Sequence, residues 1–215
     1  MMSNCSILIQ ILLVIMVVPI VFNTPIRHGC SQETLMLAEC LEPHQNYITA
    51  TLSNVTGPEI SNPIFMSKFV EFTKTLAMCI DKKPACDTTR HYKYFIDALS
   101  YVSQTIYNPK VFACLKKIER PVTQCFNFFP NYHTMKNFKF FGKSLSDVFK
   151  CISIELQNHQ ECSKRTTEKL KCAFVGIWHI AKKYNEFRNG SMEVVEFNPK
   201  TMMPRKMNDV ICELE

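Results

Sequence analysis

The sequence predicts an all-α protein, a disulfide-stapled bundle of about five to seven helices with an irregular C-terminal tail. First, apolar side chains recur with the helical period of 3.6 residues along most of the chain. Second, the chain has 11 Cys among 215 residues, a content typical of secreted, disulfide-linked domains. Third, the 47% hydrophobic and 20% charged residues indicate a globular chain, and only 5 Gly exclude fibrous repeats and Gly-rich phosphate loops.

Residues 1–23 are expected to be a signal peptide. The run from Ile7 to Phe22 is apolar except at Gln10 and Pro19. It is shorter than the ~20 residues that a membrane-spanning helix needs. Because this N-terminus carries no Lys or Arg, an uncleaved N-terminal anchor remains the alternative. The sequence therefore predicts a secreted, extracellular protein with no stable membrane span after cleavage.

The first three expected helices lie between the first cysteine of the body and residue 106. One covers roughly Ser31 to Leu52 and is kinked or broken at Pro43. The next begins at Asn62-Pro63, an N-cap residue followed by Pro at the first helical position, and Pro84 ends it. Its apolar stripe is Phe65, Phe69, Phe72, Leu76 and Cys79. Asp87 is expected to cap a third helix, with the stripe Tyr92, Phe95, Leu99, Val102 and Ile106.

The later helices follow the same signals. Asn108-Pro109 starts a short helix that stops before Pro121, and a short segment around Cys125 follows. The last two stripes are Phe138, Phe141, Leu145, Val148 and Ile152, and then Leu170, Phe174, Ile177, Ala181 and Tyr184. Asn189-Gly190 is a helix C-terminus, and 194–197 is a candidate short edge strand. No linker separates two cores, so we expect one domain over 24–190 and a tail, 191–215, tethered by Cys212.

The cysteines are expected to form five disulfides. Cys5 leaves with the signal peptide, and the remaining even set is Cys30, Cys40, Cys79, Cys86, Cys114, Cys125, Cys151, Cys162, Cys172 and Cys212. Two cysteines ten residues apart in one straight helix are ~15 Å apart, too far for a bridge. This excludes Cys30–Cys40 and Cys162–Cys172, so each of these helices is expected to be stapled to its neighbours at two levels. Cys79 and Cys86 flank one turn and could pair across it.

No catalytic, metal or cofactor motif accompanies these helices. The body contains no G-x-S-x-G, no CxxC and no EF-hand loop, and five of the six histidines lie in five different expected elements: His44, His91, His133, His159 and His179. We therefore expect a non-enzymatic protein without metal or cofactor. Two sequons predict N-glycosylation at Asn54 and Asn189.

One basic stripe is a candidate binding feature. Lys136, Lys139, Lys143 and Lys150 share one face of an expected helix, beside its apolar stripe. Such a helix can meet an anionic membrane surface or a sulfated glycan, whereas the alternative is a core-facing helix with a solvated Lys face. The net charge of +6 mildly favours acidic partners, and nucleic acid is not expected for a secreted chain.

Two functions lead, and an unrecognised hydrolase is the third alternative. The first is a binding scaffold for an extracellular protein or glycan. The second is a carrier of a small apolar ligand such as a lipid, because 16 Phe and 11 Met can line a pocket as well as fill a core. A carrier predicts an internal cavity lined by Phe and Met, and a scaffold predicts a filled core with an exposed binding patch.

The cysteine order provides a resemblance. The signal peptide, Cys30-x9-Cys40, the aromatic helix to Cys79 with Cys86 close behind, Cys114-x10-Cys125, and Cys151-x10-Cys162-x9-Cys172 resemble the nematode secreted cysteine-rich domains of unknown function. The resemblance covers roughly Cys30 to Tyr184. It implies a helical, extracellular, disulfide-linked domain and brings no activity, cofactor or site residue.

Overall fold

The computed structural model describes residues 30–47, 63–80, 83–118, 124–125, 147, 150–152, 154–156, 162–193 and 195–201. The all-α prediction is confirmed. The elements are α2 (Ser31–Leu41), η1 (Glu42–His44), α4 (Pro63–Cys79), α5 (Asp87–Ile106), α6 (Pro109–Lys117), α9 (Lys164–Arg188) and η5 (Pro199–Thr201). The described residues include no strand, so Val195–Phe197 does not form the expected edge strand. Among these residues we find no helix with the length and apolar character needed to cross a membrane.

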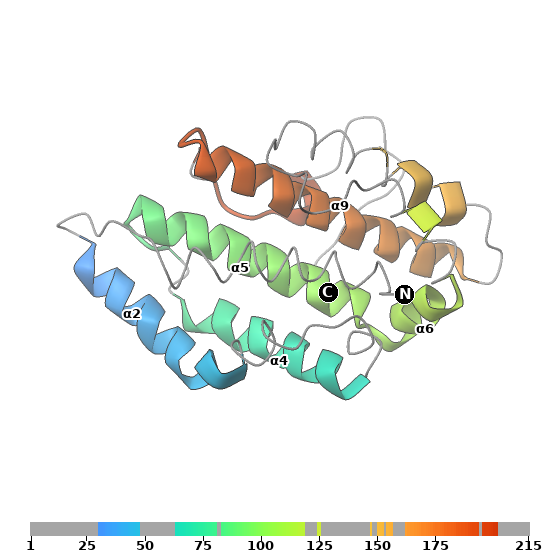
Figure 1. Cartoon of the computed structure of the whole chain (residues 1–215), viewed down its shortest axis with the longest axis horizontal. Coiled ribbons are helices and arrows are strands. Elements are labelled where there is room, and N and C mark those ends of the chain that lie inside the picture. Colours follow the sequence, from blue (N-terminus) through green and yellow to red (C-terminus); the bar gives the residue numbers. More distant parts are fainter. Residues whose placement is uncertain are drawn as a thin grey trace.

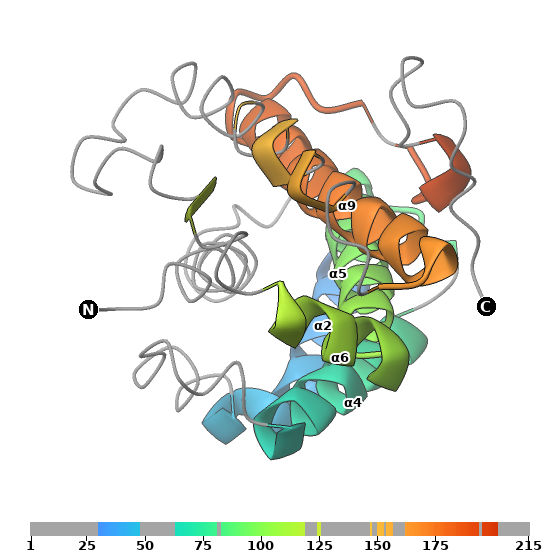
Figure 2. The ribbon, with the colours of Figure 1, turned by 90° about the vertical axis from the view of Figure 1, so that its right-hand side faces the viewer.

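Helix α5 lies at the centre of the fold. In both views α9 lies on one side of α5, and α4 with α2 lies on the other (Figures 1 and 2). Helices α4 and α9 both run antiparallel to α5 (Figure 1). α6 packs against α9 and the end of α5. This sandwiched position explains why α5 buries residues around most of its circumference.

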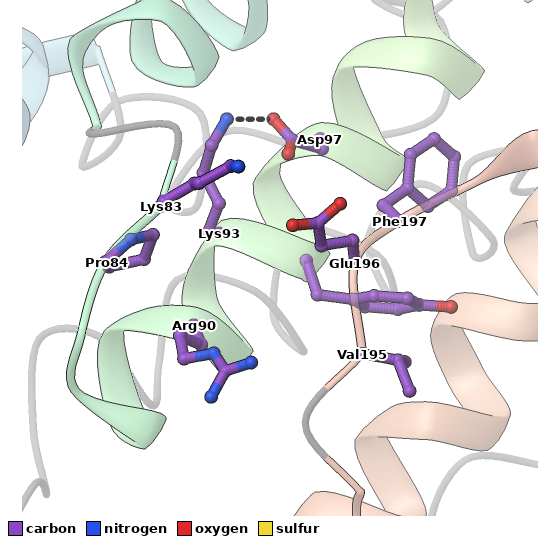
Figure 3. Close-up of a pocket in the computed structure, with 9 residues that line it drawn as sticks. Lys83, Pro84, Arg90, Lys93, Asp97, Val195, Glu196 and Phe197 are labelled. Atoms are coloured by element: carbon purple, nitrogen blue, oxygen red, sulfur yellow. Dashed lines mark hydrogen bonds and ion pairs between the residues drawn. The ribbon is translucent and has the colours of Figure 1, made fainter.

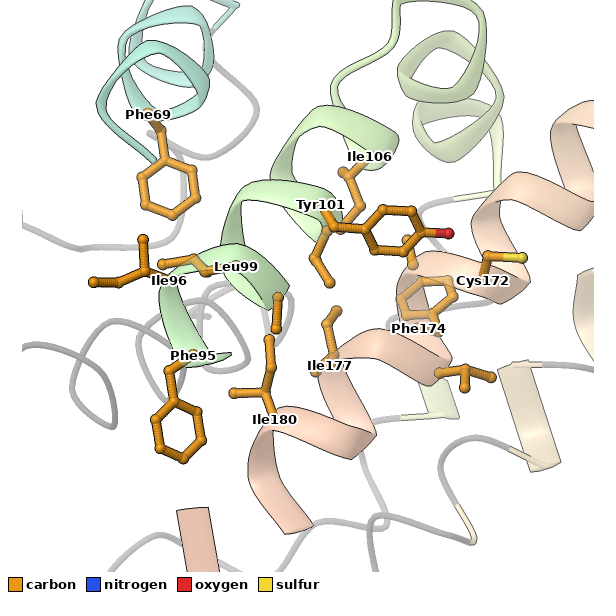
Figure 4. Close-up of a cluster of buried hydrophobic side chains, with 14 of the residues drawn as sticks. Phe69, Phe95, Ile96, Leu99, Tyr101, Ile106, Cys172, Phe174, Ile177 and Ile180 are labelled. Carbon is orange, nitrogen blue, oxygen red and sulfur yellow. The ribbon is translucent and has the colours of Figure 1, made fainter. Parts of the chain in front are cut away.

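The core fills the two interfaces of α5. From α9, Leu170 and Ile180 are fully buried and Ile177 is 3% exposed. Figure 4 shows Ile177 and Ile180 facing α5, with Phe69 of α4 on its other side. All five residues of the expected α5 stripe are buried, which confirms that prediction: Tyr92, Phe95, Leu99, Val102 and Ile106.

The helix ends were predicted less completely than the stripes. α4 begins at Pro63, Asn108 caps α6 by accepting a hydrogen bond from Lys110 N at 3.2 Å, and α2 changes to a 3-10 turn at Glu42–His44, as Pro43 predicted. The expected capping role of Asp87 is wrong. Cys86 occupies the N-cap position of α5 without a side-chain cap bond.

A carboxylate from another helix replaces that cap. Glu33 of α2 accepts hydrogen bonds from Ala85 N at 2.7 Å and Cys86 N at 3.1 Å. The negative charge of Glu33 thus lies at the N-terminus of α5, where the helix dipole favours it. α2 is thereby fixed to the turn that precedes α5.

Disulfides also fix α2 to the turn between α4 and α5. Cys30 pairs with Cys86, and Cys40 pairs with Cys79. α2 is therefore stapled at two levels, as expected, but the pairing of Cys79 with Cys86 is wrong. The physical reason is that α2 lies beside the turn between α4 and α5, so each of these two cysteines faces α2 instead of the other.

Two more bridges cross the other end of the fold. Cys114 of α6 pairs with Cys162, just before α9, and Cys125 pairs with Cys151. Cys172 is also disulfide-bonded, and its partner lies outside the described residues.

The segment after α9 folds back onto α5. Gly190 adopts φ +67°, and the bonds Gly190 N to Phe187 O and Ser191 N to Glu186 O close α9 in a Schellman turn. This confirms the predicted helix C-terminus. Beyond it Met192 is buried, and the Phe197 ring packs edge-on against Tyr94 and at a tilt against Tyr101, with ring centroids 5.7 and 5.8 Å away. The first part of the tail is therefore packed against the domain.

Truncating a side chain at the centre of the core tests the packing. Ile180→Ala removes a fully buried side chain between α9 and α5, so it should destabilise the protein by about 2–5 kcal/mol. The matched control Leu35→Ala, where the residue is 63% exposed, should stay within about 0.5 kcal/mol. Urea unfolding of the oxidised proteins measures both. Equal stabilities of the two variants would contradict the described core.

The fifth bridge can be predicted by elimination. Eight body cysteines pair with one another and Cys172 is bonded. If Cys5 leaves with the expected signal peptide, Cys212 is the one cysteine left to pair with Cys172. Non-reducing peptide mapping of the protein from an oxidising expression host should yield a linked pair containing Cys172 and Cys212. Free thiols at these two positions would show that the tail is not tethered there.

Candidate functional site

A groove open to solvent lies along α5. It has a volume of about 370 Å³, and we call it the α5 groove. Figure 3 shows Lys83 and Pro84 on one side of α5 and the 195–197 segment on the other. The groove is lined by Lys83, Pro84, Arg90, Lys93, Tyr94, Asp97, Val195, Glu196 and Phe197. The volume falls within the ~300–1,000 Å³ typical of ligand sites.

The floor of the α5 groove follows from helical spacing. Arg90, Lys93, Tyr94 and Asp97 lie at i, i+3, i+4 and i+7, which places them on one face of α5. The first wall, Lys83 and Pro84, belongs to the turn that Glu33 and the Cys30–Cys86 bridge hold. Glu33 and Cys30 are more than fifty positions from their partners Ala85 and Cys86 in the sequence, yet they set the position of this wall.

The second wall is anchored at both of its ends. His91 Nε2 lies 3.2 Å from the carbonyl oxygen of Met192, and because a carbonyl only accepts, the ring nitrogen donates. Burial lowers the pKa of His91, although this carbonyl acts in the opposite direction. Phe197 and the buried Pro199 pin the far end. Val195–Phe197 is thus held beside α5 by contacts at both of its ends.

A half-buried ion pair forms part of the floor. Lys93 Nζ lies 2.5 Å from Asp97 Oδ1 and also donates to the carbonyl oxygen of Ala77 in α4 at 3.0 Å. Burial raises the pKa of Asp97, while the hydrogen bond and charge of Lys93 act to lower it. Burial also raises the pKa of Tyr94 to about 12, so its hydroxyl is neutral at physiological pH.

The charges of the groove have both signs. Three cations, Lys83, Arg90 and Lys93, face two carboxylates, Asp97 and Glu196. Arg90 is exposed and lies 3.5 Å from Asp87, an exposed pair that costs little to separate. This arrangement favours a ligand that offers both a carboxylate and hydrogen-bond donors over an apolar molecule.

The backbone of the second wall has free hydrogen-bonding capacity. Within the described part of the chain, the N–H and C=O groups of Val195, Glu196 and Phe197 make no hydrogen bond. Val195 and Glu196 are exposed, so solvent reaches this segment. Exposed backbone with open donors and acceptors can pair with the main chain of another molecule.

The structure locates few of the residues that the sequence singled out for binding. Lys150 is 74% exposed and lies 3.8 Å from Asp147 on its own helical face, which matches an ordinary solvated lysine. Asn189 is exposed at the end of α9, directly before Gly190. The remaining binding and glycosylation predictions lie outside the described residues: Lys136, Lys139, Lys143 and Asn54.

Three of the five histidines are described, and each contacts an aromatic ring. His91 packs edge-on against Phe187, His44 against Phe72, and His179 against Trp178. His133 and His159 fall outside the described ranges. Where the chain is described, no three His, Cys, Asp or Glu side chains gather as a metal site.

Sequence reasoning missed the α5 groove entirely. The available signal was the i, i+4 spacing of Lys93 and Asp97, a pair that helices commonly form. Nothing local indicates that residues 83–84 and 195–197 flank this face, because they are more than a hundred residues apart.

Removing the cation of the half-buried pair tests the electrostatics of the floor. Lys93→Met leaves Asp97 without its partner and should destabilise the protein at pH 7 by about 1–3 kcal/mol. Because the pKa of Asp97 is raised, its carboxylate takes up a proton as the pH falls, and the loss should shrink toward pH 3. Urea unfolding across this pH range measures the loss.

The matched control is Lys150→Met. Its pair with Asp147 is exposed on both sides, so the substitution should stay within about 0.5 kcal/mol. A loss for Lys93→Met that stays constant from pH 7 to pH 3 would mean that the effect comes from packing, not from the charge of Asp97.

No family model, no curated protein and no solved structure matches the chain. The similarity to the nematode secreted cysteine-rich domains stays a prediction. The function proposed below rests on the chemistry of the α5 groove.

Proposed function

We propose that the protein is a secreted, non-enzymatic scaffold that binds an extracellular macromolecule, and that the α5 groove is its binding surface. The observation that carries this proposal is a mixed-charge, solvent-open groove on a cross-linked helical frame. Rigid walls reduce the conformational entropy lost on binding, which favours recognition by a preformed surface.

The disulfides support the extracellular part of the proposal. Bridges of this density persist in oxidising compartments and are rare in the cytosol. The chemistry of the groove supports the non-enzymatic part. Its ionisable groups include a Lys–Asp pair but no His or Cys, the side chains that most often serve as base or nucleophile.

The groove is poorly suited to carrying a lipid. A lipid carrier needs an apolar enclosure, whereas five of the nine lining residues are charged. Burying a hydrocarbon chain there would desolvate these charges without giving them new partners. The groove therefore favours the scaffold over the carrier of a small apolar ligand.

Two measurements on the secreted, oxidised protein test the function. The native and denatured intact masses should agree, because a scaffold retains no small molecule. A loss of a few hundred daltons on denaturation would instead make the protein a carrier. The second measurement is capture of extracellular proteins on the immobilised wild type and on Lys83→Gln/Arg90→Gln.

The matched control for this capture is Lys110→Gln/Lys117→Gln, which removes the same charge from exposed positions of α6. We expect a set of partners held by the wild type and this control and lost from the groove variant. Equal capture by all three proteins, or no capture by any, would contradict the proposed binding surface.

A further inference from the structure

We infer that the α5 groove binds an extended peptide segment of the partner, which pairs as an added β-strand with Val195–Phe197 and places an acidic side chain between Lys83 and Arg90. This inference rests on the proposed function and specifies its ligand. It combines three features of the groove: the unpaired backbone groups of Val195–Phe197, the exposed cations opposite them, and the contacts that anchor this segment.

The open backbone determines the kind of ligand. The amides and carbonyls of Val195, Glu196 and Phe197 have no hydrogen-bond partner in the described structure. A peptide that adds as a strand satisfies such groups through its own main chain. A glycan or a lipid offers no regular alternation of donors and acceptors to match them.

Two cations of the groove that lie opposite this stretch determine the charge of the ligand. Lys83 and Arg90 are exposed, and Figure 3 shows both on the far side of the groove from Val195 and Phe197. Aspartate or glutamate of a peptide can pair with Arg90 through two parallel hydrogen bonds, as guanidinium groups favour. Glu196 carries the opposite charge and is exposed, so a donor of the peptide can pair with it.

The Val195–Phe197 segment is held in place before any ligand binds. The Schellman turn at Gly190, the His91–Met192 hydrogen bond and the rings around Phe197 fix the segment on both sides. Because this segment is already anchored, a peptide that pairs with it avoids the entropy cost of ordering it on binding. Only three residues can pair with the peptide backbone, so contacts of the peptide's side chains with Lys83 and Arg90 supply the specificity.

Panning a phage library of random linear peptides against the immobilised, oxidised protein tests the inference. The enriched peptides should share an acidic residue. Their affinity should fall at least about tenfold for Lys83→Gln/Arg90→Gln, equivalent to about 1.4 kcal/mol, and should be retained by Lys110→Gln/Lys117→Gln. Enriched peptides without an acidic residue, or equal losses in both variants, would overturn the inference.

Amide hydrogen exchange in the presence of the best peptide tests the strand pairing. Because successive amides of a strand point to opposite edges, exchange should slow at alternate residues, either at Glu196 alone or at Val195 and Phe197 together. Uniform exchange rates along this segment in the bound state would rule out strand addition. If peptides bind with charge sensitivity but without this protection, the scaffold function stands and the strand pairing fails.

A sulfated oligosaccharide provides the competing ligand. A heparin-derived fragment recognises overall positive charge, so its binding should fall equally in the two double variants, which lose the same charge. A fragment that displaces the peptide and loses affinity only in the groove variant would assign the site to a glycan and overturn the inference.

Discussion

Helix α5 carries apolar side chains on two of its faces, and both of these faces must be covered before the chain is stable in water. α9 covers one face with Leu170, Ile177 and Ile180. α4 covers the other, where the hydroxyl oxygens of Thr73 and Ser103 lie 2.7 Å apart inside the interface. The two remaining helices pack onto this three-helix core. α2 contacts α4 and α5, and α6 contacts α9 and α5.

The α5 groove is a consequence of the same arrangement. Neither α4 nor α9 covers the face with Arg90, Lys93 and Asp97, and the segments that leave these two helices become its walls. Glu33 and the Cys30–Cys86 bridge hold the first wall, and the turn at Gly190 directs the second. Thus the contacts that stabilise the two ends of α5 also set the shape of the surface that we assign to binding.

The sequence was sufficient for features that depend on neighbouring residues. The apolar stripe of α5, the Asn108 cap, the break at Pro43 and the end of α9 were all predictable, because helical period and terminal residues determine them locally. Features that depend on distant segments were not. The Glu33 carboxylate binds backbone amides that lie 52 and 53 positions later in the chain. Cys86 and Cys79 pair with Cys30 and Cys40 at the two ends of α2, not with each other. The groove escaped prediction for the same reason, since its walls meet only in the folded chain.

The most direct test of this account is a titration of the isotope-labelled protein with the selected acidic peptide, followed in two-dimensional amide spectra. The account predicts that the shifted resonances belong to the turn around Lys83, to Arg90 and to Val195–Phe197, while those of α6 stay in place. Shifts centred on α6 or around Lys150 would place the binding surface elsewhere and contradict the assignment of the α5 groove.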